Sequence, residues 1–285
     1  MGFPIGNATN PNLKSEVRWP LGIARRWPVL LPALVVLLIY LPALHYDLVW
    51  DDGIFLRDMP TYRDSELWLS ALFRPFVLSP NYFRPLALLT FAAELRLGGL
   101  NPTLFHLSNL LLHALNATLL TLLAIQLTSK RANAQTSQRP DALALGGGLL
   151  YGLHPALVEG VAFISSRFDL LTTTFLLLAL LADVTLRGRR ARPILVGLAF
   201  LLAALSKEMA LAFVLVLPLW HLAREGGQII NLPYLWKRSQ ESGDLLVYVA
   251  VSVAGLLSAT SAWATCWPPL PETHCPLARC CNTFC

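Results

Sequence analysis

Long apolar runs separated by short polar stretches dominate this sequence. Seven runs approach the length of a bilayer-spanning helix, which needs about 20 residues. They cover residues 27–46, 103–127, 142–157, 168–186, 193–206, 209–222 and 245–263. The third, fifth and sixth runs are shorter than this, which suits a protein whose outer half opens into a polar cavity. The pattern predicts an all-α polytopic membrane protein with about seven transmembrane helices.

The composition supports a membrane protein. Hydrophobic residues make up 55% of the chain and charged residues only 14%, whereas a soluble domain carries about 25% charged residues. So few charges cannot cover a water-filled exterior, which excludes an ordinary soluble enzyme, a disordered tail and a fibrous protein. The net charge is +5. Because the basic residues lie mainly between the apolar runs, we interpret them as topology signals and predict no nucleic-acid partner.

The distribution of basic residues predicts the orientation. Fourteen of the 22 lysines and arginines precede the first run or follow the second, fourth or sixth run. They are Lys14, Arg18, Arg25, Arg26, Lys130, Arg131, Arg139, Arg187, Arg189, Arg190, Arg192, Arg224, Lys237 and Arg238. The positive-inside rule makes this side cytoplasmic. The orientation requires that residues 84–97 do not cross, so we predict an interfacial helix there.

Three regions follow from this organisation. Residues 1–26 form a polar cytoplasmic leader, and residues 27–264 form a transmembrane domain with a long first exoplasmic loop at 47–102. Residues 265–285 are a tail that contains all five cysteines. Its composition changes so abruptly that we interpret it as a truncated or frame-shifted, non-native end. The alternative is a natural exoplasmic tail with paired cysteines, and in both cases we assign it no chemistry.

The first candidate for chemistry is the adjacent pair Asp51 and Asp52, just beyond the first apolar run. Neighbouring carboxylates repel each other, so one of them can act as a base near neutral pH. The pair can also hold a divalent cation. The alternative is an ordinary helix N-cap or a loop salt bridge. The sequence shows no metal-binding spacing of His and Cys, and we predict no other cofactor.

Further ionisable residues gather at the predicted outer ends of three runs. They are His154, Glu159, Arg167, Asp169, Lys207 and Glu208. Each charge at membrane depth costs roughly 2.5–3.5 kcal/mol, so such groups usually line a cavity or form pairs. One interpretation is an outward-facing polar cavity in which carboxylates transfer protons and arginine and lysine side chains bind an anion. The other is local pairing of Arg167 with Asp169 and of Lys207 with Glu208.

Two further features have structural interpretations. His106 and His113 share one helix face, and we favour buried hydrogen-bonding residues over metal ligands. The run of three glycines at 146–148 is typical of a close helix contact rather than of a phosphate-binding loop.

Five motifs in order resemble one membrane family. They are YDLVWDDGIFL, NYFRPLALLTF, GLNPTLFHLSNLLLHAL, LHPALVEGVAFISSRFDLL and LLAALSKEMAL, and the resemblance covers about residues 46–217. This region resembles the N-terminal membrane region of the transmembrane and tetratricopeptide-repeat O-mannosyltransferases and their bacterial relatives, in the GT-C superfamily. The resemblance implies a glycosyltransferase that moves a mannose-like sugar from a polyprenyl-phosphate donor to a hydroxyl acceptor, expected on a protein, at the exoplasmic face.

The resemblance also implies roles for individual residues. The acidic pair of the family is matched by Asp51 and Asp52, and Arg84 stands in its Tyr-Arg-Pro-Leu motif with Phe83 in place of tyrosine. Its remaining outer motifs are matched by His154, Glu159, Arg167, Asp169, Lys207 and Glu208. We expect Asp51 to be the catalytic base and Asp52 to position it or a bound ion, with Glu159 as the next candidate base. We expect the other six residues to bind the donor, Arg167 and Lys207 through its phosphate.

The further spans and helical repeats of that family are missing here, so activity of this chain is an open question. Alternatives are a ligase or polymerase of polyprenyl-linked glycans, a secondary transporter, and an inactive truncated remnant. The location predicted is the bacterial inner membrane, or the endoplasmic reticulum if the protein is eukaryotic.

Overall fold

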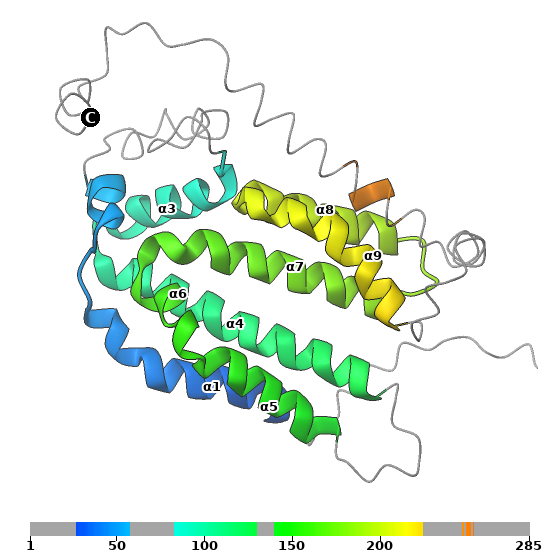
Figure 1. Ribbon diagram of the computed structural model, residues 1–285. Coiled ribbons are helices and arrows are strands. Elements are labelled where there is room, and N and C mark those ends of the chain that lie inside the picture. The colour runs from blue at the N-terminus through cyan, green and yellow to red at the C-terminus, as the bar shows by residue number, and fades with distance from the viewer. Residues whose placement is uncertain are drawn as a thin grey trace, which may run out of the picture.

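A computed structural model describes residues 27–57, 83–129, 140–224, 247, 249–251 and 253 (Figure 1). Within these residues the chain is helical and contains no β-strand. The elements are α1 (Trp27–Tyr40), η2 (Leu41–His45), η3 (Gly53–Arg57), α3 (Pro85–Gly98), α4 (Pro102–Ser129), α5 (Pro140–Leu153), η6 (Pro155–Leu157), α6 (Glu159–Ala162), η7 (Ile164–Ser166), α7 (Arg167–Thr185), α8 (Arg192–Ser206), η8 (Glu208–Ala212) and α9 (Phe213–Arg224). The η elements are short 3₁₀ turns, apart from η3, which is a π-turn.

The predicted apolar runs coincide with helices. The first six correspond to α1 with η2, α4, α5, α7, α8 and α9, which confirms the all-α prediction. The seventh, residues 245–263, lies almost wholly outside the described residues. Two segments, Pro102–Thr128 and Ile164–Thr185, are long and apolar enough to cross a membrane. Helices α1, α5 and α8 are apolar but shorter, so the number of seven spans is not confirmed.

Helix α4 is the centre of the bundle. It packs against α1, α5 and α7, and α7 packs in turn against α8. Figure 1 shows these helices side by side, with α3 at the end of the bundle where α8 stops. Residues 45–57, the start of α3, the segment 154–169 and residues 207–208 lie at this end, which we call the loop end. Helix α3, at the predicted interfacial segment, contacts α4, α7 and α8.

The bundle exposes apolar side chains on its outside and buries a stripe of polar side chains within its largely apolar interior. Leucines four residues apart are exposed on two helices: Leu30, Leu34 and Leu38 on α1, and Leu107, Leu111 and Leu115 on α4. The opposite face of α4 buries a polar stripe of His106, Asn109, His113 and Asn116. This spacing places the four on one helix face. Exposed leucines beside a buried polar stripe are typical of a helix bundle surrounded by hydrocarbon.

The polar stripe fastens the end of α5 and the short helix α6 to α4. His106 Nδ1 lies 3.0 Å from the carbonyl oxygen of Val161, and His113 Nε2 lies 3.0 Å from that of Gly152. Because a carbonyl oxygen only accepts, each of these ring nitrogens carries a hydrogen and donates it. The preference for buried hydrogen-bonding histidines is thus confirmed. Their bonds satisfy backbone groups that apolar surroundings would otherwise leave unpaired.

Small residues bring α5 close to its neighbours. A Cβ atom on Gly148 would lie 2.0 Å from Thr121 Oγ1, and one on Gly152 would lie 2.5 Å from Val36 Cγ2. Nothing lies within 4 Å of the same position on Gly146 or Gly147. The predicted close contact is therefore confirmed at Gly148 and wrong for the other two glycines of the run. Close backbone approach through small residues is a common means of packing membrane helices.

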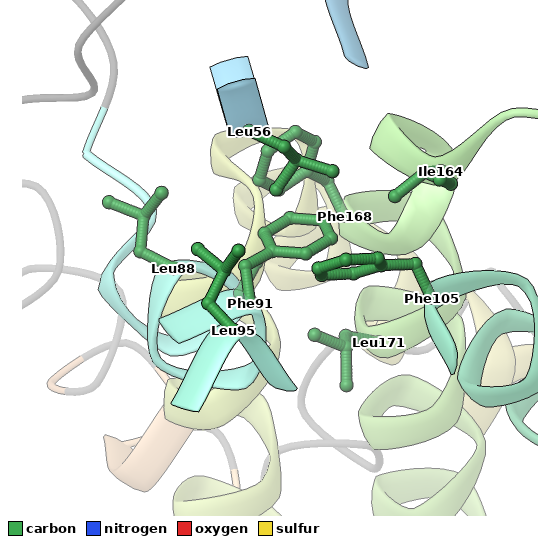
Figure 2. Close-up of a cluster of buried hydrophobic side chains, with 9 residues drawn as sticks. Leu56, Leu88, Phe91, Leu95, Phe105, Ile164, Phe168 and Leu171 are labelled. Atoms are coloured by element: carbon green, nitrogen blue, oxygen red, sulfur yellow. The ribbon is translucent and has the colours of Figure 1, made fainter. Parts of the chain in front are cut away.

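A cluster of aromatic and aliphatic side chains fills the loop end beneath the polar residues. Figure 2 shows Phe91 of α3, Phe105 of α4 and Phe168 of α7 meeting at its centre. The ring centroids of Phe91 and Phe168 are 6.0 Å apart with the planes nearly perpendicular, a favourable edge-to-face arrangement. Leu56 of η3 is buried in the same cluster. This cluster anchors the segment that carries the acidic pair.

Candidate functional site

The loop end brings together the sequence segments that carry the predicted site residues. Hydrogen bonds or ion pairs join Asp52 to Ser165, Arg84 to Glu208, and Lys207 to Asp169. The partners in these contacts are separated by 113, 124 and 38 positions in the sequence. The predicted grouping of the acidic pair, Arg84, the 154–169 segment and the Lys-Glu turn is therefore a spatial cluster.

The two aspartates have opposite environments. Asp51 is exposed, whereas Asp52 is fully buried. The Asp52 carboxylate accepts hydrogen bonds from the backbone amides of Ile164 (3.1 Å) and Ser165 (2.9 Å) and from the Ser165 hydroxyl (2.6 Å). Just before the pair, Trp50 has a φ of 50°, a left-handed conformation that is uncommon for a bulky residue. The turn leaves only Asp51 accessible to a substrate.

Arg167 is a buried structural residue. Its guanidinium donates to Glu94 Oε2 at 2.6 Å, to Asn109 Oδ1 at 2.8 Å and to the carbonyl oxygen of Phe105 at 2.8 Å. It also stacks 4.3 Å above the Phe91 ring. The side chain has no solvent exposure. These partners occupy the guanidinium, so the structure does not present Arg167 on the surface where we expected it to meet a lipid phosphate.

Arg84 and Glu208 form a bidentate pair between the start of α3 and the start of η8. Arg84 Nε lies 3.0 Å from Glu208 Oε2, and Nη2 lies 2.5 Å from Oε1. The guanidinium also lies 4.8 Å from the centre of the Phe168 ring. Burial raises the pKa of Glu208, but the hydrogen bonds and charge of Arg84 outweigh it and hold that pKa below its usual value. The Glu208 side chain remains 38% exposed.

Lys207 and Asp169 form the more accessible pair. Lys207 Nζ lies 2.6 and 2.8 Å from the two carboxylate oxygens of Asp169. The alternative of local pairing, Arg167 with Asp169 and Lys207 with Glu208, is wrong in its choice of partners. Each of these charged side chains instead pairs with a residue from another segment, because side chains that are close in the sequence point in different directions from the backbone. An exposed pair of this kind contributes little to stability, at most about 1 kcal/mol.

The other two predicted residues lie at the surface. His154 is exposed, and its Nδ1 accepts a hydrogen bond from the Ala156 amide at 3.2 Å, which caps η6. Glu159 is exposed at the first position of the one-turn helix α6. Within the described residues its carboxylate forms no ion pair.

Sequence reasoning missed several residues that organise the loop end. Asn109 Nδ2 lies 3.2 Å from the carbonyl oxygens of Gly160, Phe163 and Ile164, so one side chain holds three carbonyls of the segment above it. Asn109 follows His106 by three positions, so the two residues share one face of the helix, and this spacing was the available signal in the sequence. Ser165, which binds Asp52, lies in a polar pair of serines that gave no such signal.

A second buried ion-pair cluster lies at the opposite end of the bundle. Asp183 of α7 accepts from Arg192 of α8, with distances of 3.1 Å to Nε and 2.5 Å to Nη2. Trp220 and His221 of α9 also contact its carboxylate, at 3.2 and 3.1 Å. Arg192 entered our sequence count as a solvent-facing cytoplasmic charge, whereas the structure buries it. Among the residues that the structure describes, no group of three or more metal-binding side chains was found.

Comparisons with known proteins give partial similarities to protein O-mannosyl-transferases. TMTC2 of Mus musculus is 30% identical over 166 residues, which cover 55% of this chain and 19% of the relative. TMTC1 and TMTC4 of Homo sapiens are each 37% identical over 104 and 110 residues, covering 36% of this chain and 11% and 14% of the relatives. No family model and no solved structure matches.

The chain spans about a fifth or less of the length of these curated relatives. Over about a third to a half of its length, this chain is therefore similar to the protein O-mannosyl-transferases TMTC1, TMTC2 and TMTC4.

Proposed function

We propose that this chain is the membrane region of a glycosyltransferase that transfers a mannose-like sugar from a polyprenyl-phosphate donor to a hydroxyl group of a protein at the exoplasmic face. The observation that carries the proposal is the loop end, where an exposed carboxylate, Asp51, shares one end of the bundle with two partly buried, ion-paired cations, Arg84 and Lys207. The similarity to protein O-mannosyl-transferases supports the reaction class.

The surroundings of the loop end suit an amphipathic donor. A polyprenyl-phosphate sugar has a long apolar tail and a charged head, so its site must adjoin both hydrocarbon and water. Exposed leucines cover α1 and α4, and the charged residues gather where these helices end. A multi-pass protein with its loop end at the exoplasmic surface could hold the tail along the bundle and the phosphate at the loop end.

Lys207 and Arg84 are the cations we assign to the donor phosphate. Lys207 is the more accessible, with 23% of its side chain exposed against 11% for Arg84. A phosphate that approached Lys207 would replace the Asp169 carboxylate as its partner. Both cations would then stabilise the negative charge that grows on the leaving phosphate in the transition state. Arg167 supports this site from below through its buried contacts.

Asp51 is the residue we assign as the base. In direct displacement, the acceptor oxygen forms a bond to the anomeric carbon and gives its proton to the Asp51 carboxylate. The bond from that carbon to the phosphate oxygen breaks, and the phosphate leaves with the electron pair. This single displacement inverts the anomeric centre. A well-placed base contributes roughly 10²–10⁴-fold to the rate.

The test of catalysis uses the purified full chain in lipid nanodiscs, with radiolabelled polyprenyl-phosphate mannose and a serine- and threonine-containing peptide. Asp51→Asn should lower turnover about 100-fold or more, while Asp47→Asn, an exposed aspartate in the same loop, should retain it. Equal turnover of the two variants would remove Asp51 as the base. Transfer to a lipid-linked glycan but not to peptide would indicate a ligase or polymerase instead, and no transfer to either would indicate an inactive remnant.

The test of donor binding compares two cations of similar charge at opposite ends of the bundle. Lys207→Ala should weaken binding of polyprenyl-phosphate mannose about 10-fold, since one charge-assisted contact is worth roughly 1.5–3 kcal/mol. Arg189→Ala, exposed beyond the C-terminus of α7, should bind as the wild type does. Equal affinities of the two variants would contradict a phosphate site at the loop end.

A further inference from the structure

The acidic pair is held by a segment that lies 112 positions further along the chain. The two amides and one hydroxyl that meet the Asp52 carboxylate all belong to Ile164 and Ser165 of η7. The hydroxyl contact is the shortest, at 2.6 Å. Hydrogen bonds to a carboxylate are about twice as strong as those between neutral groups. Asp52 is thus fixed to η7 as firmly as a buried side chain can be.

Asp51 is oriented through this attachment. The turn that carries it closes with hydrogen bonds from the Asp52 amide to the Val49 carbonyl oxygen (3.0 Å) and from the Gly53 amide to the Trp50 carbonyl oxygen (3.2 Å). With Trp50 in the left-handed region, the turn adopts a conformation that is unfavourable for a bulky residue and must be held in place by its surroundings. The three bonds to Asp52 hold the turn from outside, together with the packing of Leu56 in the cluster at the loop end.

The support of η7 is itself buried. Asn109 of α4 contacts the carbonyl oxygens of Phe163 and Ile164, each at 3.2 Å. It also accepts from Arg167 at 2.8 Å. A continuous series of bonds therefore runs from the centre of α4 through η7 to Asp52 and ends at the exposed Asp51. Rigid support of this kind is what a proton acceptor needs, because displacement by about 1 Å can lower a rate 100-fold.

We propose that Ser165 is a positioning residue: its hydroxyl and amide lock Asp52 to η7 and thereby hold the neighbouring Asp51 toward the substrate. The proposal rests on the proposed function for its catalytic consequence, but the lock itself is a property of the folded chain. Ser165 touches neither donor nor acceptor in this scheme. Its removal should therefore change turnover without changing donor affinity.

The experiment measures the lock directly by carboxyl footprinting. The full chain in nanodiscs is treated with a water-soluble carbodiimide and glycine amide, and fragment-ion mass spectrometry separates labelling of Asp51 from that of Asp52. In the wild type Asp51 should label and Asp52 should be protected. Ser165→Ala should increase Asp52 labelling severalfold, while Ser165→Thr, which keeps a hydroxyl, should retain the protection. Ser166→Ala is the matched control, since the neighbouring hydroxyl is not among the groups bonded to Asp52.

The same four proteins are assayed for mannose transfer from polyprenyl-phosphate mannose to peptide. We expect Ser165→Ala to lower kcat about 10-fold with unchanged donor affinity, and Ser165→Thr to restore it. Unchanged Asp52 protection in Ser165→Ala would overturn the lock. Increased labelling with unchanged kcat would overturn the positioning role. If no protein transfers sugar while the labelling changes as expected, the proposed function fails and the lock stands.

Discussion

Arg167 and Glu94 form an ion pair at 2.6 Å that joins the start of α7 to the last turns of α3, across 73 positions of sequence. The arginine side chain has no exposure and the glutamate side chain only 11%. The guanidinium lies on the Phe91 ring at 4.3 Å, so its surroundings offer no water to replace a lost partner. The pair therefore fixes the position of α3 on the bundle.

Glu94→Gln should destabilise the protein strongly. The substitution keeps the shape of the side chain but leaves the Arg167 charge without a counter-ion in a buried site. Breaking a buried pair on one side costs about 3–5 kcal/mol. We expect the free energy of unfolding to fall by about 3 kcal/mol, measured by thermal or denaturant unfolding of the purified protein in detergent.

The matched control is Glu159→Gln, which removes the same charge from an exposed position at the loop end. It should change the free energy of unfolding by less than about 0.5 kcal/mol. If both variants were equally stable, the Arg167–Glu94 pair would not be the element that holds α3.

The sequence predicted the helices well because their signal is local. Residues 103–127 and 168–186 are long apolar runs, and α4 and α7 occupy them almost residue for residue. The composition and the motif order likewise indicated which residues gather at the loop end. Each of these inferences depends on neighbours in the chain, on the side-chain period of a helix, or on the likeness of a short motif.

The partners within the loop end could not be predicted, because they depend on the direction of each side chain in the folded bundle. Lys207 and Glu208 are neighbours in sequence, yet they pair with Asp169 and Arg84 on different elements. The sequence assigned different roles to Asp51 and Asp52 but, for the same reason, did not indicate that Asp51 is exposed and Asp52 is buried. The left-handed residue Trp50 turns the chain between the first apolar run and this pair.

Acid should weaken the contact between α3 and η8. The folded-state pKa of Glu208 lies below its ordinary value of 4.5, so its pair with Arg84 stabilises the fold fully above that pH. This contribution is lost as the pH falls through the lower folded-state pKa. We expect Glu208→Gln to have a lower Tm than the wild type at neutral pH, with the two converging once the pH has fallen through the folded-state pKa of Glu208.

The measurement is the Tm in detergent as a function of pH, with Asp47→Asn as the control that removes a carboxylate without an ion pair. That control should run parallel to the wild type. A difference between Glu208→Gln and the wild type that stayed constant down to the lowest pH would show that the charge of Glu208 is not what stabilises the contact.

The proposed orientation places the loop end and the far end of α7 on opposite sides of a membrane. Asp51, Glu159 and Lys207 should be exoplasmic, and Arg189 should be cytoplasmic, because exposed arginines gather at the far end. Cysteines are introduced singly at 51 and 189 in a version in which serine replaces the five tail cysteines, and intact cells are treated with an impermeant maleimide. Position 51 should be labelled in intact cells, whereas position 189 should be labelled only after permeabilisation. Labelling of both positions before permeabilisation would exclude this topology.

Two glycines on α5 should respond in opposite directions to the same substitution. A Cβ atom on Gly148 would lie 2.0 Å from Thr121 Oγ1 and 3.1 Å from Pro32 Cγ, so α5 would have to move away from α4 and α1. Such overpacking costs about 1–3 kcal/mol. Gly146 has open space at the same atom, and alanine there should stabilise the helix by about 0.5–1 kcal/mol because glycine loses more backbone entropy on folding.

Unfolding of Gly148→Ala and Gly146→Ala in detergent tests this difference in sign. The double substitution Gly148→Ala, Thr121→Ala should recover part of the loss, because it removes the nearest atom. Equal effects of the two single substitutions would mean that α5 does not pack on α4 through Gly148.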